Sequence, residues 1–494
     1  LQYDFSYLQH GHQLQIASYG EVFLSGEYKV ASWVSGTRYA LSGDKLAMLN
    51  HYLSRIYLAS IRGSYSDFNI EGRGISRPGI LNKRGIANRS GSSSLLELAK
   101  LSGGQDKRLI EAAIERINQT KPESYFVLPL HRHFWRGDYT QHLRPEYSFN
   151  VRMVSDRTER TEAGNRENLL GKFLPDGSTN IQRTGGEYYN IMPVWEWDKI
   201  PGITCRDFEE DRRTIIQWGE IGSTSFVGGV SDGKYGASAY DMDYDSVKAK
   251  KAWFFFDREV VSLGAGISSR GAENLVTTIN QCWLSGKVFA DKAGKISAVE
   301  RDKGSSDFNW VWHDSIGYFF PQKEMVSISS GIQKGSWNDI NGNCSKDEVS
   351  GKVFKMWTNH GTQPSGGQYS LITVPGISRD EMKSYDKNRI VILSNTSSVQ
   401  AVAHTGLNII QIVFYQPGMV DAMDLQVSVD KPCIVLIKRQ DDNLSVSIAD
   451  PAQKEKVVDM LIKSTVKNKE MKLAGRLPEG HEAGASAQFR IDWK

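Results

Sequence analysis

Several features that would place this chain in a common functional class are absent. Its four cysteines, Cys205, Cys282, Cys344 and Cys433, are widely spaced and form no CxxC pair, which argues against a zinc cluster and gives no indication of disulfides. No apolar run approaches the ~20 residues of a membrane span, so no membrane partner is expected. The Gly-rich run 228–233 is not followed by Lys-Ser/Thr, which argues against a phosphate-binding loop.

A strong net charge is also absent. The formal charge is +3 over 494 residues, which is too small to indicate nucleic acid as a partner. The charge is unevenly placed, because residues 62–109 hold nine Lys and Arg against four Asp and Glu. Such a patch fits a polyanionic ligand held in a cleft, and a solvated face is the alternative interpretation.

The first part of the chain has a helical hydrophobic period. Leu46, Leu49, Leu53 and Ile56 recur at three- and four-residue steps, which predicts a helix with Ser42 as its N-cap. A second helix is predicted over residues 110–117 by the spacing of its isoleucines and alanine, with Asp106 as its cap. This helical pattern ends near residue 124.

From about residue 125 the apolar period changes to two. Tyr147, Phe149, Val151 and Met153 alternate with polar residues, which predicts a strand with one buried face. Further strands are predicted at 252–256, 352–357, 369–374, 409–414 and 433–437. The remainder of the chain is therefore predicted to be mostly antiparallel β structure.

A length of 494 residues exceeds what a single core supports, so two or three domains are expected. The segment 376–388 is rich in charged and small residues and predicts a border between a large and a smaller β domain. We expect a helical domain over 1–124, a central β domain over 125–385 and a small β domain over 386–494.

A histidine, a tyrosine and two arginines lie in two short runs. Residues 7–20 contain His10 and Tyr19, and residues 69–78 contain Arg73 and Arg77 in a Gly-rich loop, where the backbone can approach a sugar closely. No usual hydrolase or nucleotide motif accompanies them. The set suits removal of a carbon-bound proton beside a carboxylate, as in eliminative cleavage of an acidic polysaccharide. Packing or capping is the alternative role for the His and the Tyr.

Elimination at a uronic acid makes specific demands. A donor must neutralise the carboxylate and stabilise the enolate-like state. A base must take the C5 proton, and an acid must protonate the leaving O4. In glucuronate the C5 hydrogen and the C4 oxygen lie on one face, so one group can do both. Tyrosine suits this double role if a nearby arginine lowers its pKa from ~10.

These runs also carry a resemblance to a known family. The text Tyr-Leu-Gln-His-Gly-x-Gln-Leu-Gln-Ile-x-Ser-Tyr-Gly at 7–20 resembles the catalytic segment of the polysaccharide lyase family that holds chondroitin AC, hyaluronate and xanthan lyases. Further matching runs lie at 67–78, 141–145, 147–155 and 187–204. The resemblance extends from residue 1 to near the C-terminus.

The resemblance implies a fold and a function. The fold is α+β and multidomain, with the C-terminal part of an incomplete α/α toroid followed by a large antiparallel β-sandwich domain and a small C-terminal β-sandwich domain. The function is cleavage of chondroitin sulfate and hyaluronan at glucuronate, which gives 4,5-unsaturated uronate products. A monomer in a secreted or periplasmic bacterial location is expected, although no signal peptide is visible at residue 1.

The resemblance also assigns roles residue by residue. Tyr19 resembles the general base and acid, and His10 resembles the residue that helps neutralise the uronate carboxylate. Arg73 resembles the arginine beside the tyrosine, and Glu162 resembles the carboxylate that orients the His/Arg pair. Three substrate contacts are implied: Arg77, Asn165 and the sugar-stacking Trp218.

One departure from the family is large. Residue 1 is expected to follow the first half of the toroid, which in the family holds a carboxylate-binding asparagine and a pair of cleft tryptophans. The alternative function is therefore a catalytically incomplete glycosaminoglycan-binding fragment, or a chain that pairs with its missing N-terminal portion. A hydrolase that uses two carboxylates is a third hypothesis, supported only by scattered Glu and Asp pairs.

A calcium site is a further hypothesis. Glu196 and Asp198 are two apart on an expected extended segment and would point the same way. With Asp207 they offer hard oxygen ligands that suit Ca²⁺. Surface charge is the alternative. The resemblance implies a structural calcium held by Glu196, Asp198, Asp207 and the backbone carbonyl of Phe208.

Overall fold

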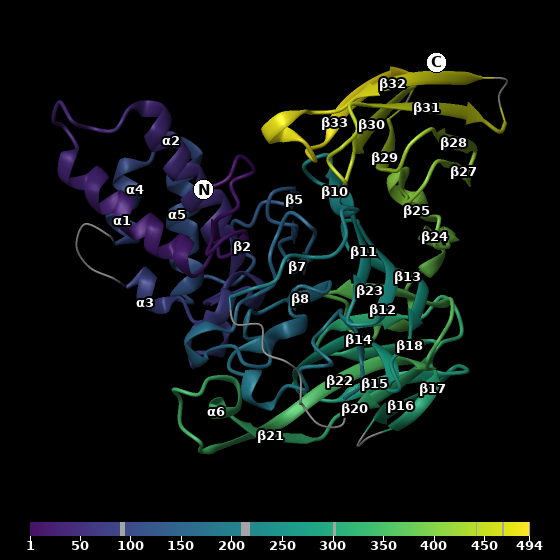
Figure 1. Cartoon of the computed structure of the whole chain (residues 1–494), viewed down its shortest axis with the longest axis horizontal. Helices are drawn as coiled ribbons and strands as arrows, with labels where there is room; N and C mark the ends of the chain where they lie inside the picture. The colour runs from purple at the N-terminus through teal and green to yellow at the C-terminus, as the bar shows by residue number, and fades with distance from the viewer. Residues whose placement is uncertain (89–93, 209–217, 300–302, 441, 467–468, 494) are drawn as a thin grey trace.

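The computed structural model describes residues 1–88, 94–208, 218–299, 303–440, 442–466 and 469–493. A helical N-terminal part lies beside a stack of β-sheets, and the C-terminal sheets lie beyond them at one end (Figure 1). Within the described residues, no helix combines the length and the apolar character needed to cross a membrane.

The helical part is held together by one apolar core. Its helices are α1 (Tyr19–Val34), α2 (Gly43–His51), α3 (Arg84–Ala87), α4 (Leu95–Leu101) and α5 (Gly104–Ile117). A π-helical turn (Tyr52–Tyr57) extends α2, and the short hairpin β3 (Ile61–Arg62) and β4 (Tyr65–Ser66) follows. Leu49, Leu53 and Ile56 are buried with Ile110 and Ile114, as their spacing predicts.

The cap predicted for α5 is wrong. Gly103 occupies its N-cap, and Asp106 lies in the first turn of the helix. There the Asp106 carboxylate accepts hydrogen bonds from Ser54 Oγ at 2.9 Å and Arg55 Nε at 3.0 Å. The side chain therefore ties α5 to the turn after α2. Ser42 does occupy the N-cap of α2, but its side chain makes no capping hydrogen bond.

A four-stranded antiparallel sheet follows the helical part. Its strands, in spatial order, are β5 (Leu130–Phe134), β6 (Tyr139–Leu143), β7 (Ser148–Arg152) and β8 (Ser178–Gln182). The strand predicted from the alternation at 147–153 is present as β7, and every residue of it is buried. Its polar face packs against the helical part, where Asn150 Nδ2 donates to Asp67 and Arg152 Nη1 donates to the carbonyl of Asn69.

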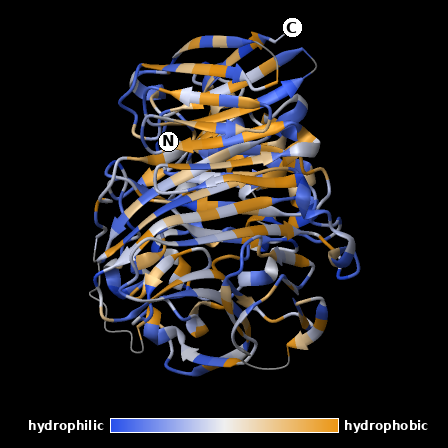
Figure 2. Cartoon of the chain, turned by 90° about the vertical axis from the view of Figure 1, so that its right-hand side faces the viewer, coloured by the Kyte–Doolittle hydropathy of each residue, from blue (hydrophilic) through white to orange (hydrophobic). Residues whose placement is uncertain are grey.

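The central β region consists of two larger antiparallel sheets. The nine-stranded sheet has the order β10 (Val227–Ser231), β11 (Gly236–Tyr244), β12 (Val247–Phe255), β13 (Val260–Ser269), β23 (Gly367–Pro375), β19 (Ile316–Phe319), β18 (Trp310–His313), β15 (Val288–Lys292) and β16 (Lys295–Val299). The second sheet has the order β17 (Lys303–Asp307), β20 (Met325–Ser329), β22 (Glu348–Thr362), β14 (Asn274–Trp283) and β9 (Thr204–Arg206). Strand β21 (Ile332–Ser336) also pairs with β22, and the short helix α6 (Trp337–Ile340) follows β21. Apolar side chains of both sheets form one core, and hydrophobic stretches run along the central strands (Figure 2).

The C-terminal region is a smaller pair of sheets around its own core. One sheet has the order β24 (Ile390–Asn395), β25 (Val399–His404), β26 (Ile409–Phe414), β29 (Cys433–Gln440), β30 (Asn443–Ala449) and β33 (Ala487–Asp492). The other has the order β27 (Gly418–Ala422), β28 (Leu425–Val429), β31 (Val457–Ser464) and β32 (Glu470–Arg476). The segment 376–388 joins β23 to β24 and contains the short helix α7 (Glu381–Ser384) and the start of a 3₁₀ turn (Lys387–Arg389). The five strands predicted beyond residue 250 overlap β12, β22, β23, β26 and β29.

Buried histidines in the four-stranded sheet make its stability depend on pH. Burial lowers the pKa of His133 to about 3 and that of His131 and His142 well below its usual range. Below about pH 6.5 the unfolded chain therefore takes up protons that the folded chain excludes. These histidines make the free energy of unfolding smaller as the pH is lowered. Asp67 and Glu71 act in the opposite direction, because burial raises the pKa of each to about 6.

A single variant separates these contributions. We expect His133→Gln to reduce the loss of unfolding free energy between pH 7 and pH 5 by about 2 kcal/mol, because one protonation site of the unfolded chain is removed. The measurement is urea denaturation at both pH values, with the exposed His481→Gln as control. A pH dependence that is the same in the parent and in His133→Gln would contradict this expectation.

Candidate active site

Short local structures hold His10 and Tyr19 in place. His10 lies in the turn between β1 (Leu8–Gln9) and β2 (Gln13–Leu14), with a left-handed φ of 53°. Gly11 follows with φ 77°, and a Cβ at that position would clash with the Glu159 carboxylate. Glycine is therefore required there. Tyr19 is the first residue of α1, so its side chain projects from the start of a rigid element.

Arg73 comes from a buried segment rather than from an open loop, and Arg77 lies at the exposed end of that segment. Residues Gly72–Ser76 form a 3₁₀ helix, and Arg77 follows it. Gly72 has φ 57°, and a Cβ at that position would clash with the side chain of Gln15. The glycine therefore allows close packing inside the protein, and the prediction that the Gly-rich backbone approaches a sugar finds no support at this residue.

Glu162 is the centre of the site. Its carboxylate is fully buried and accepts hydrogen bonds from His10 Nδ1 at 2.9 Å and from Arg73 Nη1. Arg73 Nη2 donates to the Tyr19 hydroxyl at 2.8 Å, and the rings of His10 and Tyr19 are 4.8 Å apart. Exposure rises from 0% at Glu162 through 8% at Arg73 to 33% at His10. The four residues therefore form one cluster that opens toward solvent at His10.

A second carboxylate, Glu167, was not anticipated from the sequence. It accepts from Arg73 Nε at 2.8 Å and from Arg77 at 2.6 and 2.9 Å. Burial opposes its ionisation, but these arginines hold the pKa of Glu167 below its usual range. Gln13 was also missed: its Nε2 donates to Glu162, and its Oε1 accepts from the Glu162 amide. Glu167 stands in no periodic pattern or motif, whereas Gln13 lies inside the run at 7–20 that carries the family resemblance, which was the signal that could have marked it.

The protonation state of His10 follows from its surroundings. Burial, followed by the charge of Arg73, lowers the pKa of His10 below its ordinary value. The ring is therefore neutral near pH 7, and Nδ1 carries the proton that it donates to Glu162. This contact turns Nε2 away from the buried carboxylate. The pKa of an imidazole in such a position rises when an anion binds beside it.

Asn165 and Trp218 lie on the exposed side of the cluster. Asn165 is exposed with a left-handed φ of 60°, and its carbonyl accepts a hydrogen bond from Asn343 Nδ2 at 2.9 Å. The Trp218 ring lies against Gly164, 6.3 Å from the ring of His10, and 55% of the residue is exposed. An exposed indole beside the cluster offers a flat surface to a ligand.

The acidic residues of the calcium hypothesis surround a lysine. Lys199 Nζ lies 3.1 Å from Glu196, 3.7 Å from Asp198 and 2.5 Å from Asp207. The amide of Phe208 donates to Asp198 at 2.7 Å. Residues 197–198 lie in a turn, so the expectation of an extended segment is wrong, although the carboxylates do converge. Within the part of the chain that the structure describes, no group of three His, Cys, Asp or Glu has metal-binding geometry.

Comparison with known protein families shows which family the chain belongs to. Three models of polysaccharide lyase family 8 match the chain: the N-terminal α-helical domain at 1–116, the super-sandwich domain at 129–386 and the C-terminal β-sandwich domain at 391–459. The chain belongs to polysaccharide lyase family 8. The family resemblance and the α+β multidomain fold class expected from the sequence are thereby confirmed.

Individual members of family 8 give the same result. Chondroitinase-AC of Pedobacter heparinus is 51% identical over 493 residues, covering 99% of this chain and 69% of that protein. A hyaluronate lyase of Thermasporomyces composti is 28% identical over 65% of this chain and 42% of its own. A solved chondroitinase AC lyase from a study of enzyme–oligosaccharide complexes superposes with a TM-score of 0.94 at 50% identity, covering 99% of this chain and 72% of that one. The chain is thus a family 8 polysaccharide lyase homologous to chondroitinase AC.

Proposed function

We propose that this chain cleaves chondroitin sulfate, with hyaluronan as a lesser substrate, by elimination at glucuronate. The observation that carries the proposal is the 2.8 Å hydrogen bond from Arg73 to the Tyr19 hydroxyl, inside a cluster where Glu162 also holds His10. A tyrosine beside a fixed guanidinium is suited to lose and regain a proton. The four residues supply the base, the acid and the cation that the elimination needs.

Tyr19 performs both proton transfers in this proposal. In the proposed step the deprotonated oxygen of Tyr19, which Arg73 Nη2 faces at 2.8 Å, takes the C5 proton of glucuronate. The electrons of the C5–H bond form the C4–C5 double bond, and the C4–O bond breaks. The phenol then gives this proton to the leaving O4 on the same face, so the phenolate is restored. The atoms balance without an added oxidant, reductant or water.

His10 and Arg77 hold the substrate carboxylate and the neighbouring sugar. A uronate carboxylate beside Nε2 of His10 favours the imidazolium, which then donates from Nδ1 to Glu162 and from Nε2 to the carboxylate. Arg77 is half-exposed and kept in place by Glu167, so its charge remains available to an anionic sugar. Asn165 and Trp218 complete the binding surface, with the Trp218 indole stacked on a sugar ring.

The test is the ultraviolet absorbance of the product, since only elimination leaves a double bond conjugated with the carboxylate. The 494-residue chain is incubated with chondroitin sulfate and with hyaluronan, and binding is measured in parallel. Growth of absorbance with both polymers, faster with chondroitin sulfate, supports the proposal. Binding without absorbance would instead establish the alternative of an incomplete glycosaminoglycan-binding fragment, an outcome of interest because the chain spans 69% of its Pedobacter relative. We place this activity in a secreted or periplasmic monomer, because the polymeric substrate is extracellular.

The stereochemistry of the uronate gives a second expectation. Iduronate has the opposite configuration at C5, so its proton faces away from Tyr19 when O4 faces toward it. Dermatan sulfate is therefore expected to resist cleavage at iduronate, while glucuronate units in the same polymer are cleaved. The measurement is the yield of unsaturated disaccharides from both polymers. Equal yields would contradict the use of one tyrosine for both transfers.

We also propose a structural calcium at Glu196, Asp198, Asp207 and the carbonyl of Phe208. Carboxylate and carbonyl oxygens are the donors that Ca²⁺ takes. The three carboxylates already converge on one ammonium, that of Lys199, which a bound cation would displace. Calcium would brace the turn at 197–198 without contact to the sugar.

The calcium proposal predicts a change in thermal stability. Calcium is expected to raise the melting temperature of the chain relative to a chelator, because the unfolded chain has no such site. Asp198→Asn is expected to remove most of this increase, while the exposed Asp421→Asn keeps it. The measurement is a pair of melting curves for each protein. Identical midpoints for the parent with calcium and with chelator would exclude the site.

A further inference from the structure

A cavity of about 580 Å³ lies at the junction of the three parts of the chain. Its walls come from the helical part, from strand β5 with the segment before it, and from residues 484–488 of the C-terminal region. None of His10, Tyr19, Arg73 and Glu162 lines it. The cavity is therefore separate from the site proposed for the lyase reaction, and its volume is that of an ordinary small-molecule pocket.

The charge of the cavity wall has one sign. No Asp or Glu is among the described residues that line it, whereas four arginines are: Arg55, Arg62, Arg116 and Arg132. Arg55 is balanced by Asp106, with Nε and Oδ1 3.0 Å apart. The other three guanidinium groups have no carboxylate within ion-pair distance in the described part of the chain. Glu187, Glu123 and Glu146 still act on Arg62 from beyond that distance, whereas no carboxylate contributes to the pKa shift of Arg116 or Arg132.

Two of these arginines bond only to the backbone. Arg62 donates to the carbonyls of residues 183, 144 and 145, and Arg116 donates to the carbonyl of Tyr125. Carbonyl groups satisfy N–H donors, but they carry no charge. Both side chains are buried, and burial lowers the pKa of each to about 10. The positive charge at this wall is therefore costly.

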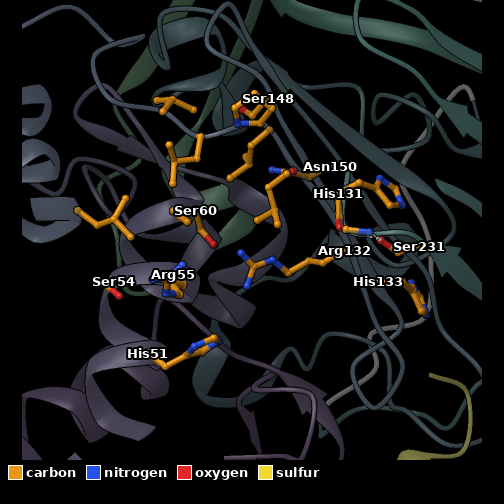
Figure 3. A pocket seen from close by; sticks show the side chains of 18 of the residues that line it. His51, Ser54, Arg55, Ser60, His131, Arg132, His133, Ser148, Asn150 and Ser231 are labelled. Carbon is orange, nitrogen blue, oxygen red and sulfur yellow. Dashed lines mark hydrogen bonds between the residues drawn. The ribbon is translucent and has the colours of Figure 1, made fainter. Parts of the chain in front are cut away.

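Arg132 is the most exceptional of the group. Its side chain extends from β5 toward Arg55 and Ser60, while His131 and His133 extend to the other face of the strand (Figure 3). Its Nε is shielded from solvent without a hydrogen-bond partner, and its guanidinium makes no hydrogen bond or ion pair in the described part of the chain. Burial lowers the pKa of Arg132 to about 10. The guanidinium lies 5.7 Å from the centroid of the Phe134 ring, a cation–π contact that leaves its N–H donors free to bind an anion.

We propose that this cavity binds a small organic anion whose carboxylate, sulfate, sulfonate or phosphate group pairs with Arg132. A planar guanidinium binds such groups through two parallel hydrogen bonds. The segment 126–130 supplies apolar residues to the wall, which suits a ligand body of one or two rings. Because the walls come from three regions, a bound anion joins the helical part to both β regions.

Binding of defined probes tests the proposal. The 494-residue chain is titrated calorimetrically with inorganic sulfate, inorganic phosphate and naphthalene-2-sulfonate, with chloride used to keep the ionic strength constant. The sulfonate is expected to bind most tightly, since it matches both the charge and the apolar wall, and a neutral two-ring alcohol is expected to bind at least tenfold more weakly. Sulfate and phosphate carry the charge but have no rings, so their binding measures recognition of the charged group alone.

Variants locate the binding. Arg132→Gln is expected to weaken sulfonate binding at least tenfold, whereas Arg476→Gln, an exposed arginine on β32, leaves it unchanged. In chloride alone Arg132→Gln is expected to melt no lower than the parent, because it removes a partly buried charge that has no carboxylate partner in the described part of the chain. Arg116→Gln serves as the second variant if Arg132→Gln does not fold, with the same expected loss of binding. Equal sulfonate binding by the parent and the folded variant, or no binding of any of the three anions, would overturn the proposal.

Discussion

Tyr19→Phe is expected to lower the turnover of chondroitin sulfate by about 10²–10⁴-fold while substrate binding is retained. The substitution removes only the hydroxyl that accepts the 2.8 Å hydrogen bond from Arg73. With that oxygen the protein loses both the base for the C5 proton and the acid for O4. The measurements are kcat from ultraviolet absorbance and the dissociation constant of the polymer for the same preparation.

A matched control exists on the surface of the helical part. Tyr39 is also a tyrosine whose hydroxyl accepts a hydrogen bond from an arginine, Arg38, but it is exposed. Tyr39→Phe is expected to leave kcat unchanged. A Tyr19→Phe variant with near-parental turnover would remove Tyr19 from the mechanism, whatever its effect on binding.

Glu162→Gln is expected to lower kcat by about 10² or more, because two groups lose their orientation at once. The carboxylate fixes the Nδ1 proton of His10, and it also accepts from Arg73, which contacts Tyr19. The amide of glutamine can accept one of these bonds but carries no charge. Arg73 keeps its pair with Glu167, so the loss of folding stability is expected to be smaller than the ~3–5 kcal/mol of a fully broken buried pair.

The control for Glu162 is a similar cluster elsewhere in the chain. Glu259 is buried and lies 3.4 Å from His404 and 3.9 Å from Arg389, at the contact between the central and C-terminal regions. Glu259→Gln is expected to lower the melting temperature without changing kcat. If both variants lose the same stability and neither loses turnover, Glu162 is a structural residue and the proposed role is wrong.

Much of the fold could be predicted because it depends on local patterns. The spacing of Leu49, Leu53 and Ile56 describes one helix face, and those residues are buried together. The runs at 369–374 and 409–414 are strands because alternate or continuous apolar residues fit a buried sheet. Residues that can serve either as a helix cap or as a partner in a tertiary contact were predicted less well. Asp106 satisfies the composition of a helix cap, but its partners are Ser54 and Arg55, which no local pattern reveals.

The residue types of the candidate site are visible in the sequence, and the family pattern of the runs that hold them is enough to single them out. A His, a Tyr, arginines and a carboxylate indicate proton transfer beside an anion because of their intrinsic chemistry. Which of them meet could not be deduced from spacing, since Glu162 is 152 positions from His10 and 89 from Arg73. The clamp of Glu167 on Arg73 and Arg77 spans a similar separation.

The sequence by itself therefore determined the succession of helical and β regions, the family and the chemical types of the site. Only the tertiary structure decided the contacts between distant segments, because these depend on how whole sheets and helices pack. It buried both faces of β7, placed Lys199 among three carboxylates and left Arg132 unpaired in a cavity. Each of these is an electrostatic or packing relation between residues far apart in the chain, and such relations leave no periodic mark in the sequence.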